Sequence, residues 1–186
     1  MRISKFAAAI CIGLALFGGV ASSARAGTDA GIEIGFSPDG SGESLVLKAL
    51  NSARQSIRLA GYSFTAAPVV RALVDAKKRG VDVAVAVDYK NNLIEDRSGK
   101  ARAALNALVN AGIPTRVVSA FPMQHSKYAV IDGAHVQTGS YNYSVMAARF
   151  SSENVLVIWS RPDLARQYLD NWQRVYNVGQ PYTSTF

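Results

Sequence analysis

Residues 56–87, SIRLAGYSFTAAPVVRALVDAKKRGVDVAVAV, decide the fold class of this chain. Two apolar runs, 56–64 and 81–87, are rich in strand-forming residues and are expected to form β-strands. Between them, residues 67–79 repeat apolar side chains at helical spacing. This segment ends in basic residues followed by Gly80, which is typical of a helix C-terminus. The stretch therefore predicts a strand, a helix and a second strand in succession.

The same alternation continues on both sides of this stretch. Further strands are expected at 32–36, 115–118, 127–132, 135–140 and 154–159, and further helices at 43–54, at 100–110 and after Ser160. Ser160 and Asp163 are expected to cap the last helix, with Pro162 in its first turn. Such alternation predicts an α/β fold, a layered α/β sandwich with a mixed central β-sheet flanked by helices.

The first 26 residues have the three parts of a secretory signal peptide. Arg2 and Lys5 precede an apolar core at 6–20, and residues 24–26 fit an A-x-A cleavage site. The apolar core is short for a membrane span. We therefore expect residues 1–26 to be a signal peptide and the protein to be periplasmic or secreted, without stable membrane association after cleavage.

Residues 27–186 are expected to form a single domain, because no linker or internal repeat divides them. Their net charge is +4, since the whole chain carries +7 and the signal peptide holds three basic residues and no acidic ones. This mild positive charge favours polyanionic partners such as nucleic acid. The candidate substrate-binding residues follow the strand at 81–87, and they are Lys90, Arg97, Lys100 and Arg102.

Metal ligands are scarce in the chain. It has two histidines, His125 and His135, and its one cysteine, Cys11, lies in the signal peptide. A zinc site of ordinary composition is therefore excluded, whereas a carboxylate-bound Mg²⁺ site is harder to exclude. We expect metal-independent chemistry and no cofactor.

A spaced set of polar residues occupies the two strands expected at 127–132 and 135–140. The set is His125, Lys127, Asp132, Gly139, Ser140 and Asn142. Because side chains alternate along a strand, His125 and Lys127 are expected on one face and Asp132 on the other, in a supporting role. Asp132-Gly133 favours a tight hairpin turn. Four polar groups can therefore converge on one pocket.

The chemistry of these groups suits a phosphodiester substrate. Lys127 provides a positive charge, and Ser140 and Asn142 provide donors, for the negative charge that grows on the phosphoryl oxygens. The imidazole of His125 can attack phosphorus or transfer a proton. His135 lacks such support and is expected to be an ordinary strand or turn residue. Glu153, at the start of the strand at 154–159, is either an exposed strand-edge acid or a paired one.

The spacing matches the HxKx₄Dx₆GSxN motif of the phospholipase D superfamily. Four further stretches, 35–38, 62–65, 77–83 and 121–125, resemble the small secreted bacterial endonucleases of that superfamily, which are described as EDTA-resistant. The resemblance implies an α/β sandwich. It also implies that Glu153 hydrogen-bonds the catalytic imidazole. Since larger members carry two motifs and this chain carries one, it implies a homodimer in which two copies of His125 share a pocket.

The leading expectation is therefore a metal-independent, sequence-nonspecific endonuclease acting on DNA, with RNA as a second candidate substrate. One imidazole would form a covalent phosphohistidine, and the other would protonate the leaving oxygen and later activate water. The alternative is a phospholipase D that hydrolyses phospholipid headgroups with the same residues. A noncatalytic nucleic-acid-binding protein is a third hypothesis, but binding alone would not require His125.

Overall fold

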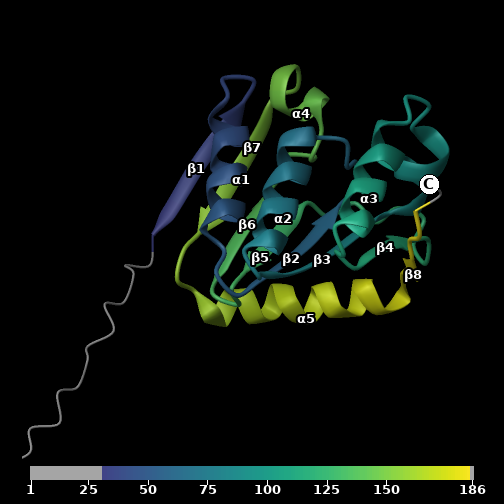
Figure 1. Ribbon diagram of the computed structural model, residues 1–186. Coiled ribbons are helices and arrows are strands. Elements are labelled where there is room, and N and C mark those ends of the chain that lie inside the picture. Colours follow the sequence, from purple (N-terminus) through teal and green to yellow (C-terminus); the bar gives the residue numbers. More distant parts are fainter. Residues whose placement is uncertain (1–30, 185–186) are drawn as a thin grey trace, which may run out of the picture.

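The computed structural model describes residues 31–184 (Figure 1). The expected signal peptide lies outside the described residues. The strands are β1 (Ile32–Ser37), β2 (Ser56–Gly61), β3 (Asp82–Asp88), β4 (Thr115–Val118), β5 (Tyr128–Ile131), β6 (His135–Gly139), β7 (Glu153–Ile158) and β8 (Gln180–Pro181). The helices are α1 (Ser41–Ser52), α2 (Ala67–Lys78), α3 (Lys100–Asn110), α4 (Val145–Arg149), α5 (Pro162–Val178) and a π-helix, η1 (Lys90–Glu95).

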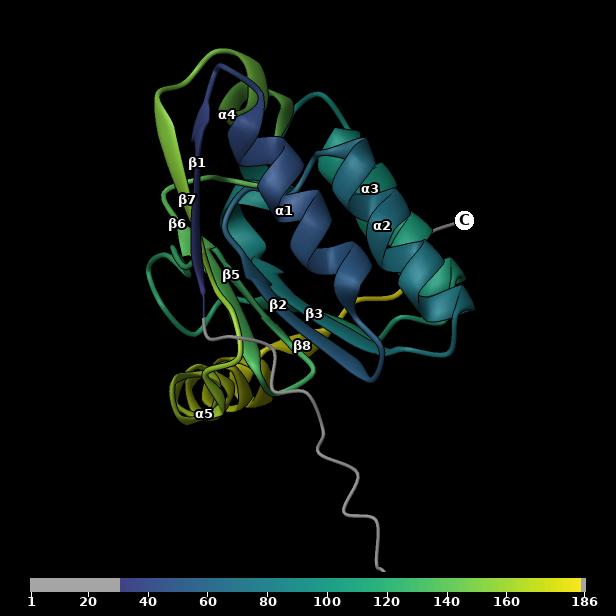
Figure 2. The same cartoon turned by 90° about the vertical axis from the view of Figure 1, so that its left-hand side faces the viewer.

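These strands form one mixed sheet of eight strands, in the order β1-β7-β6-β5-β2-β3-β4-β8. β2, β3 and β4 are parallel, and the other neighbouring pairs are antiparallel. Helices α1, α2 and α3 cover one face of the sheet, and α5 lies along the other (Figure 2). This is the α/β sandwich with a mixed central sheet that the alternation of strands and helices predicted.

The central strands are buried because helices cover both of their faces. In β3, every residue after Asp82 is buried, which explains its unbroken apolar sequence. Leu50 of α1 and Leu73 of α2 are fully buried on one side. Burial of one such side chain contributes about 1.5–3 kcal/mol. On the other side, the indole of Trp172 in α5 donates a hydrogen bond to the Leu59 carbonyl at 2.9 Å.

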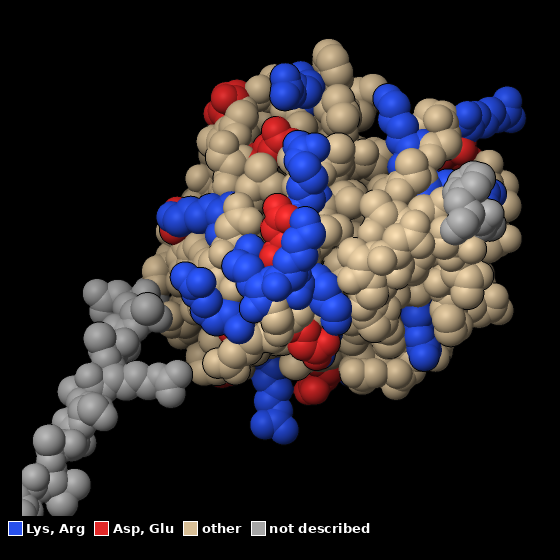
Figure 3. All heavy atoms as spheres, viewed as in Figure 1, with Lys and Arg blue, Asp and Glu red and all other residues tan. Residues whose placement is uncertain are grey.

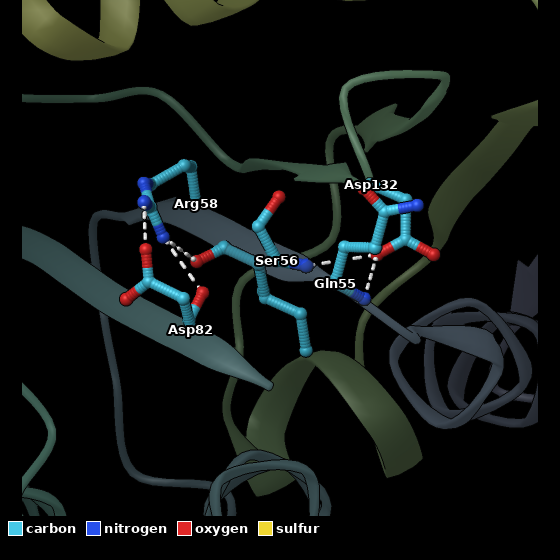
Figure 4. Close-up of polar contacts among 6 residues, drawn as sticks. Gln55, Ser56, Arg58, Asp82 and Asp132 are labelled. Carbon is cyan, nitrogen blue, oxygen red and sulfur yellow. Dashed lines mark hydrogen bonds and ion pairs between the residues drawn. The ribbon is translucent and has the colours of Figure 1, made fainter. Parts of the chain in front are cut away.

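The hairpin between β5 and β6 is anchored by Asp132. Asp132 and Gly133 have φ angles of 54° and 60°, as the predicted tight turn requires. The Asp132 carboxylate accepts hydrogen bonds of 2.7 to 3.2 Å from the backbone N–H groups of Arg54, Gln55 and Ser56. Figure 4 shows the bonds from Gln55 and Ser56. Asp132 therefore ties the hairpin to the segment between α1 and β2. The role of Asp132 is therefore structural.

Some boundaries differ from those that the sequence predicted. β5 begins at Tyr128, so His125 and Lys127 precede the strand, and the argument from side-chain alternation does not apply to them. The predicted Ser160 cap of α5 is wrong. Arg161 occupies the N-cap position, and its guanidinium donates to the Asp163 carboxylate. By contrast, α2 ends at Lys78 and Gly80 has a φ of 88°, as the predicted helix end requires.

Candidate active site

Asp132 lies at one end of the sheet, in the turn between β5 and β6, whereas the strands bring His125, Lys127, Ser140 and Asn142 together at the opposite end. β2 and β3 are parallel and end there. β5 runs antiparallel to β2 and so begins there, β6 ends there, and β7 begins there. The residues at or next to these five strand ends are Tyr62, Asp88, His125, Lys127, Ser140, Asn142 and Glu153. Five chain segments therefore build one site.

The side chains of His125, Lys127 and Tyr62 form the centre of this site. His125 is exposed, and its ring centroid lies 4.5 Å from that of Tyr62. Lys127 is buried; its Nζ donates to the His125 carbonyl oxygen at 2.7 Å and lies 5.0 Å from the Tyr62 ring centroid. An ammonium group has three donors, so two stay available for a substrate. Tyr62 lies outside the motif, and only its place after a predicted strand could have indicated it.

Burial and neighbouring charges tune the two ionisable groups. Burial lowers the pKa of His125 below 6.5, the positive charge of Lys127 lowers it further, and the negative charge of Asp88 opposes both. Neutral imidazole is the form that attacks phosphorus or accepts a proton, and this environment favours it at neutral pH. Burial also lowers the pKa of Lys127, and Glu153 opposes that shift.

Glu153 contacts a different residue from the one predicted. Its Oε2 accepts a hydrogen bond from the Ser140 hydroxyl. The Ser140 oxygen in turn accepts from the backbone N–H of Asn154 at 3.0 Å. Within residues 31–184 of one chain, the predicted hydrogen bond between Glu153 and His125 is not formed. The acidic group whose charge acts on His125 is Asp88.

Gly139 and Asn142 shape the other side of the site. Gly139 has a φ of 149°, and a Cβ atom at this position would lie 2.2 Å from the Asn154 carbonyl oxygen. Only glycine allows β6 to end so close to β7. Asn142 follows this close approach, and its Oδ1 is buried without a hydrogen-bond partner. This unpaired acceptor belongs to the motif itself and is available to a hydrogen-bond donor of a ligand.

The four candidate substrate-binding residues are either bonded to other groups or exposed. Lys90 forms an ion pair with Glu95 at 3.2 Å, and Arg102 donates to the Leu93 carbonyl at 2.6 Å. Arg97 and Lys100 are exposed. Among the described residues, no hydrogen bond or ion pair links any of these four residues to the motif.

Other basic side chains gather over α2, including its C-terminal end, and over the C-terminal end of α1 (Figure 3). They include Arg71, Lys78 and Arg79. Since α2 runs back from the site end of the sheet, its basic C-terminus lies at the opposite end. This charge can attract a polyanion over a distance but does not line the site.

Two absences complete the description of residues 31–184. No group of three or more His, Cys, Asp or Glu side chains in this range is arranged to hold a metal ion. None of the helices described is both long enough and apolar enough to cross a membrane.

Comparisons with known proteins agree on one family. Residues 46–176 match the family described as "Cardiolipin synthase, PLD-like domain". The structure is similar to that of Nuc, a phospholipase D family member from Salmonella typhimurium, with a TM-score of 0.81 and 45% sequence identity. That similarity covers 84% of this chain and 100% of the Salmonella chain.

Two curated relatives are more distant. A phospholipase D of Rickettsia bellii is 31% identical over 137 residues, which are 74% of this chain and 65% of the relative. A mitochondrial cardiolipin hydrolase of Danio rerio is 31% identical over 139 residues, which are 74% of this chain and 58% of the relative. The chain therefore spans less than two thirds of the length of these curated relatives.

Proposed function

The chain belongs to the phospholipase D-like domain family, and on that premise we propose that it is a phosphodiesterase that uses His125 as its nucleophile. One observation carries this proposal. The exposed imidazole, which its surroundings keep neutral, lies in the same segment as the buried ammonium of Lys127, whose Nζ is bonded to the His125 carbonyl oxygen at 2.7 Å. A nucleophile is thereby paired with a positive charge for the phosphoryl oxygens.

The reaction proceeds in two displacements. First, an imidazole nitrogen of His125 attacks phosphorus, the bond to the leaving oxygen breaks, and that oxygen takes a proton from a second imidazole. A phosphohistidine results. The second imidazole then removes a proton from water, the hydroxide attacks phosphorus, and the phosphorus–nitrogen bond breaks. Lys127 and Asn142 stabilise the charge on the phosphoryl oxygens in both steps, while the single O–H of Ser140 is donated to Glu153. No step uses a metal or a cofactor.

The second imidazole comes from a second copy of the chain. Large apolar side chains are exposed around the site end of the sheet, and they include Phe36, Met123, Met146 and Phe150, with exposed fractions of 53%, 51%, 62% and 73%. Exposed apolar side chains of this size favour an interface with another protein surface. A two-fold partner seated on it would bring two copies of His125 into one pocket. These exposed side chains support the homodimer.

Nucleic acid is the proposed substrate, and the activity is that of a sequence-nonspecific endonuclease on DNA, with RNA as a second substrate. The positive net charge and the basic surface over α2 support a polyanion. The resemblance of 62–65 and 121–125 to secreted endonucleases supports this assignment, and the signal peptide expected at 1–26 supports a periplasmic or secreted location. The names of the curated relatives favour a second candidate, a phospholipase D that acts on lipid headgroups.

The test compares both substrates under chelation. Residues 27–186 and the variant His125→Asn are assayed with plasmid DNA and with phosphatidylcholine and cardiolipin vesicles, all in EDTA. We expect DNA cleavage that survives EDTA and disappears in the variant. Loss of cleavage in EDTA with rescue by Mg²⁺ or Zn²⁺ would overturn the metal-free mechanism. Lipid hydrolysis alone would establish the second candidate, and DNA binding without hydrolysis would reveal a noncatalytic protein.

A further inference from the structure

We propose that Asp88, which lies outside the HxKx₄Dx₆GSxN motif, is the positioning residue for His125. This inference rests on the proposed function, in which His125 is the nucleophile. Asp88 ends β3, beside the end of β2, and its side chain is buried, with only 2% of the residue exposed. A carboxylate is costly to bury unless it is hydrogen-bonded. The hydrogen bonds of the Asp88 carboxylate therefore show which groups it fixes in place.

Both carboxylate oxygens of Asp88 hold backbone N–H groups. Oδ2 accepts from Gln124, the residue before His125, at 2.8 Å. Oδ1 accepts from Asn91, in the first turn of η1, at 2.6 Å. Asp88 therefore connects the end of β3 to the segment that carries the nucleophile.

Gln124 fixes the backbone on the other side of His125. It is buried, with 3% of the residue exposed, and its Oε1 accepts from the backbone N–H of Ser126 at 2.7 Å. The backbone on both sides of the nucleophile is thus fixed, by Asp88 at residue 124 and by Gln124 at residue 126. This support is needed because the segment precedes β5 and makes no strand hydrogen bonds of its own.

The charge of Asp88 has a second effect. Three ionisable groups face His125, namely Lys127, Asp88 and the phenol of Tyr62. Of the two whose charge acts on the imidazole, Asp88 alone is negative and favours the cationic ring. The ring becomes cationic when it bonds to phosphorus and when it donates a proton, so a buried carboxylate stabilises both forms. Asp88 thus supplies the negative charge near His125, although its hydrogen bonds go to the backbone and not to the imidazole.

The experiment uses the two described histidines as reporters. The imidazole titrations of His125 and His135 are followed by NMR in the wild type, in Asp88→Asn and in Asp132→Asn. Asp132 also accepts backbone N–H bonds, but its charge acts on His135. We expect Asp88→Asn to lower the His125 midpoint alone, and Asp132→Asn to lower the His135 midpoint alone. These titrations need no enzymatic activity, so they can fail or succeed independently of the proposed nuclease.

Kinetics separate positioning from a merely structural role. In Asp88→Asn, kcat on DNA should fall by about 10² or more with KM little changed, as happens when an orienting carboxylate is lost. The acid limb of the pH–rate profile should move to lower pH. A folded Asp88→Asn protein with the wild-type His125 titration and wild-type kcat would overturn the proposal.

A second variant covers the case in which Asp88→Asn does not fold. Gln124→Met removes the acceptor for the Ser126 N–H but keeps the charge of Asp88. We expect its kcat to fall while the His125 midpoint stays at the wild-type value. An unchanged kcat in this variant would show that the backbone at His125 needs no such hold, and would overturn the positioning role.

Discussion

The hydroxyl of Ser140 donates a hydrogen bond to the carboxylate of Glu153 and so joins the end of β6 to the start of β7. The same hydroxyl accepts from the backbone N–H of Asn154. Ser140 therefore holds Glu153 at the site end of the sheet, where its negative charge acts on Lys127. Ser140 was expected to donate to the substrate and Glu153 to bond to His125. In the structure these two side chains bond to each other.

Replacing Glu153 should alter the pH dependence of activity more than activity at neutral pH. Burial lowers the pKa of Lys127 and Glu153 opposes the shift, so Glu153→Gln should lower this pKa further. The alkaline limb of the kcat/KM profile should then move to lower pH. If the pKa of Lys127 fell by one unit, the loss of kcat/KM at alkaline pH would be about tenfold larger than the loss at pH 7. Glu43→Gln, another carboxylate change on the surface, is the control, and identical profiles for both variants would contradict the role of Glu153.

A shared site predicts the behaviour of a mixed dimer. Differently tagged wild-type and His125→Asn subunits are mixed, and the heterodimer is isolated and assayed on DNA. We expect it to be essentially inactive, because either the attacking or the protonating imidazole is missing. A tagged wild-type pair taken through the same steps is the control. Half of the wild-type activity, or a fully active monomer in sedimentation, would refute the two-fold site while leaving the motif assignment intact.

Gly139→Ala should destabilise the fold strongly. The new Cβ would lie 2.2 Å from the Asn154 carbonyl oxygen, at a φ of 149° that side chains rarely adopt. Since backbone cannot move aside as a flexible side chain can, we expect a loss of about 3 kcal/mol or more in the free energy of unfolding. Gly133→Ala is the matched control, because its φ is also positive, at 60°, but nothing lies within 4 Å of the added atom. Gly133→Ala should lower the free energy of unfolding by about 1 kcal/mol. Equal denaturation midpoints for the two variants would contradict this explanation.

Stability should fall as the pH drops below about 6.5. Nδ1 of His135 accepts the backbone N–H of Ser160 at 2.8 Å, so protonation breaks this bond. Burial lowers the pKa of His135 below its ordinary value of 6.5, and Asp132 opposes the shift. The unfolded chain therefore binds protons first, and stability is lost as the pH falls from 6.5 toward the folded pKa. Urea denaturation from pH 7.5 to 5.5 measures this loss.

The control for this pH dependence is His135→Asn, whose side-chain oxygen can still accept the hydrogen bond but does not titrate in this range. Its stability should depend less steeply on pH than that of the wild type. His125, whose pKa is also lowered, retains its own share of the dependence. A variant as pH-sensitive as the wild type would show that His135 is not responsible.

Most of the fold followed from local patterns. Alternating strands and helices, the turn at Asp132-Gly133 and the helix end at Gly80 depend on residues close together in the chain, so the sequence displays them directly. η1, α4 and β8 were not predicted because they are short, and β8 also depends on a partner strand that is distant in the sequence. η1 begins where Asp88 binds the Asn91 N–H, and β8 is two residues long and pairs with β4.

The sequence by itself determined the candidate reacting groups. Their types and spacing marked His125, Lys127, Ser140 and Asn142, because these residues belong to two consecutive strand ends. Only the tertiary structure decided the neighbours of His125. Asp88 and Tyr62 come from the ends of other strands, and they lie near His125 because the sheet order places β2 beside β5 and β3 beside β2. It also decided that Glu153 binds Ser140, since β6 and β7 meet across Gly139. Strand order and close approach depend on contacts between distant residues, which no local pattern records.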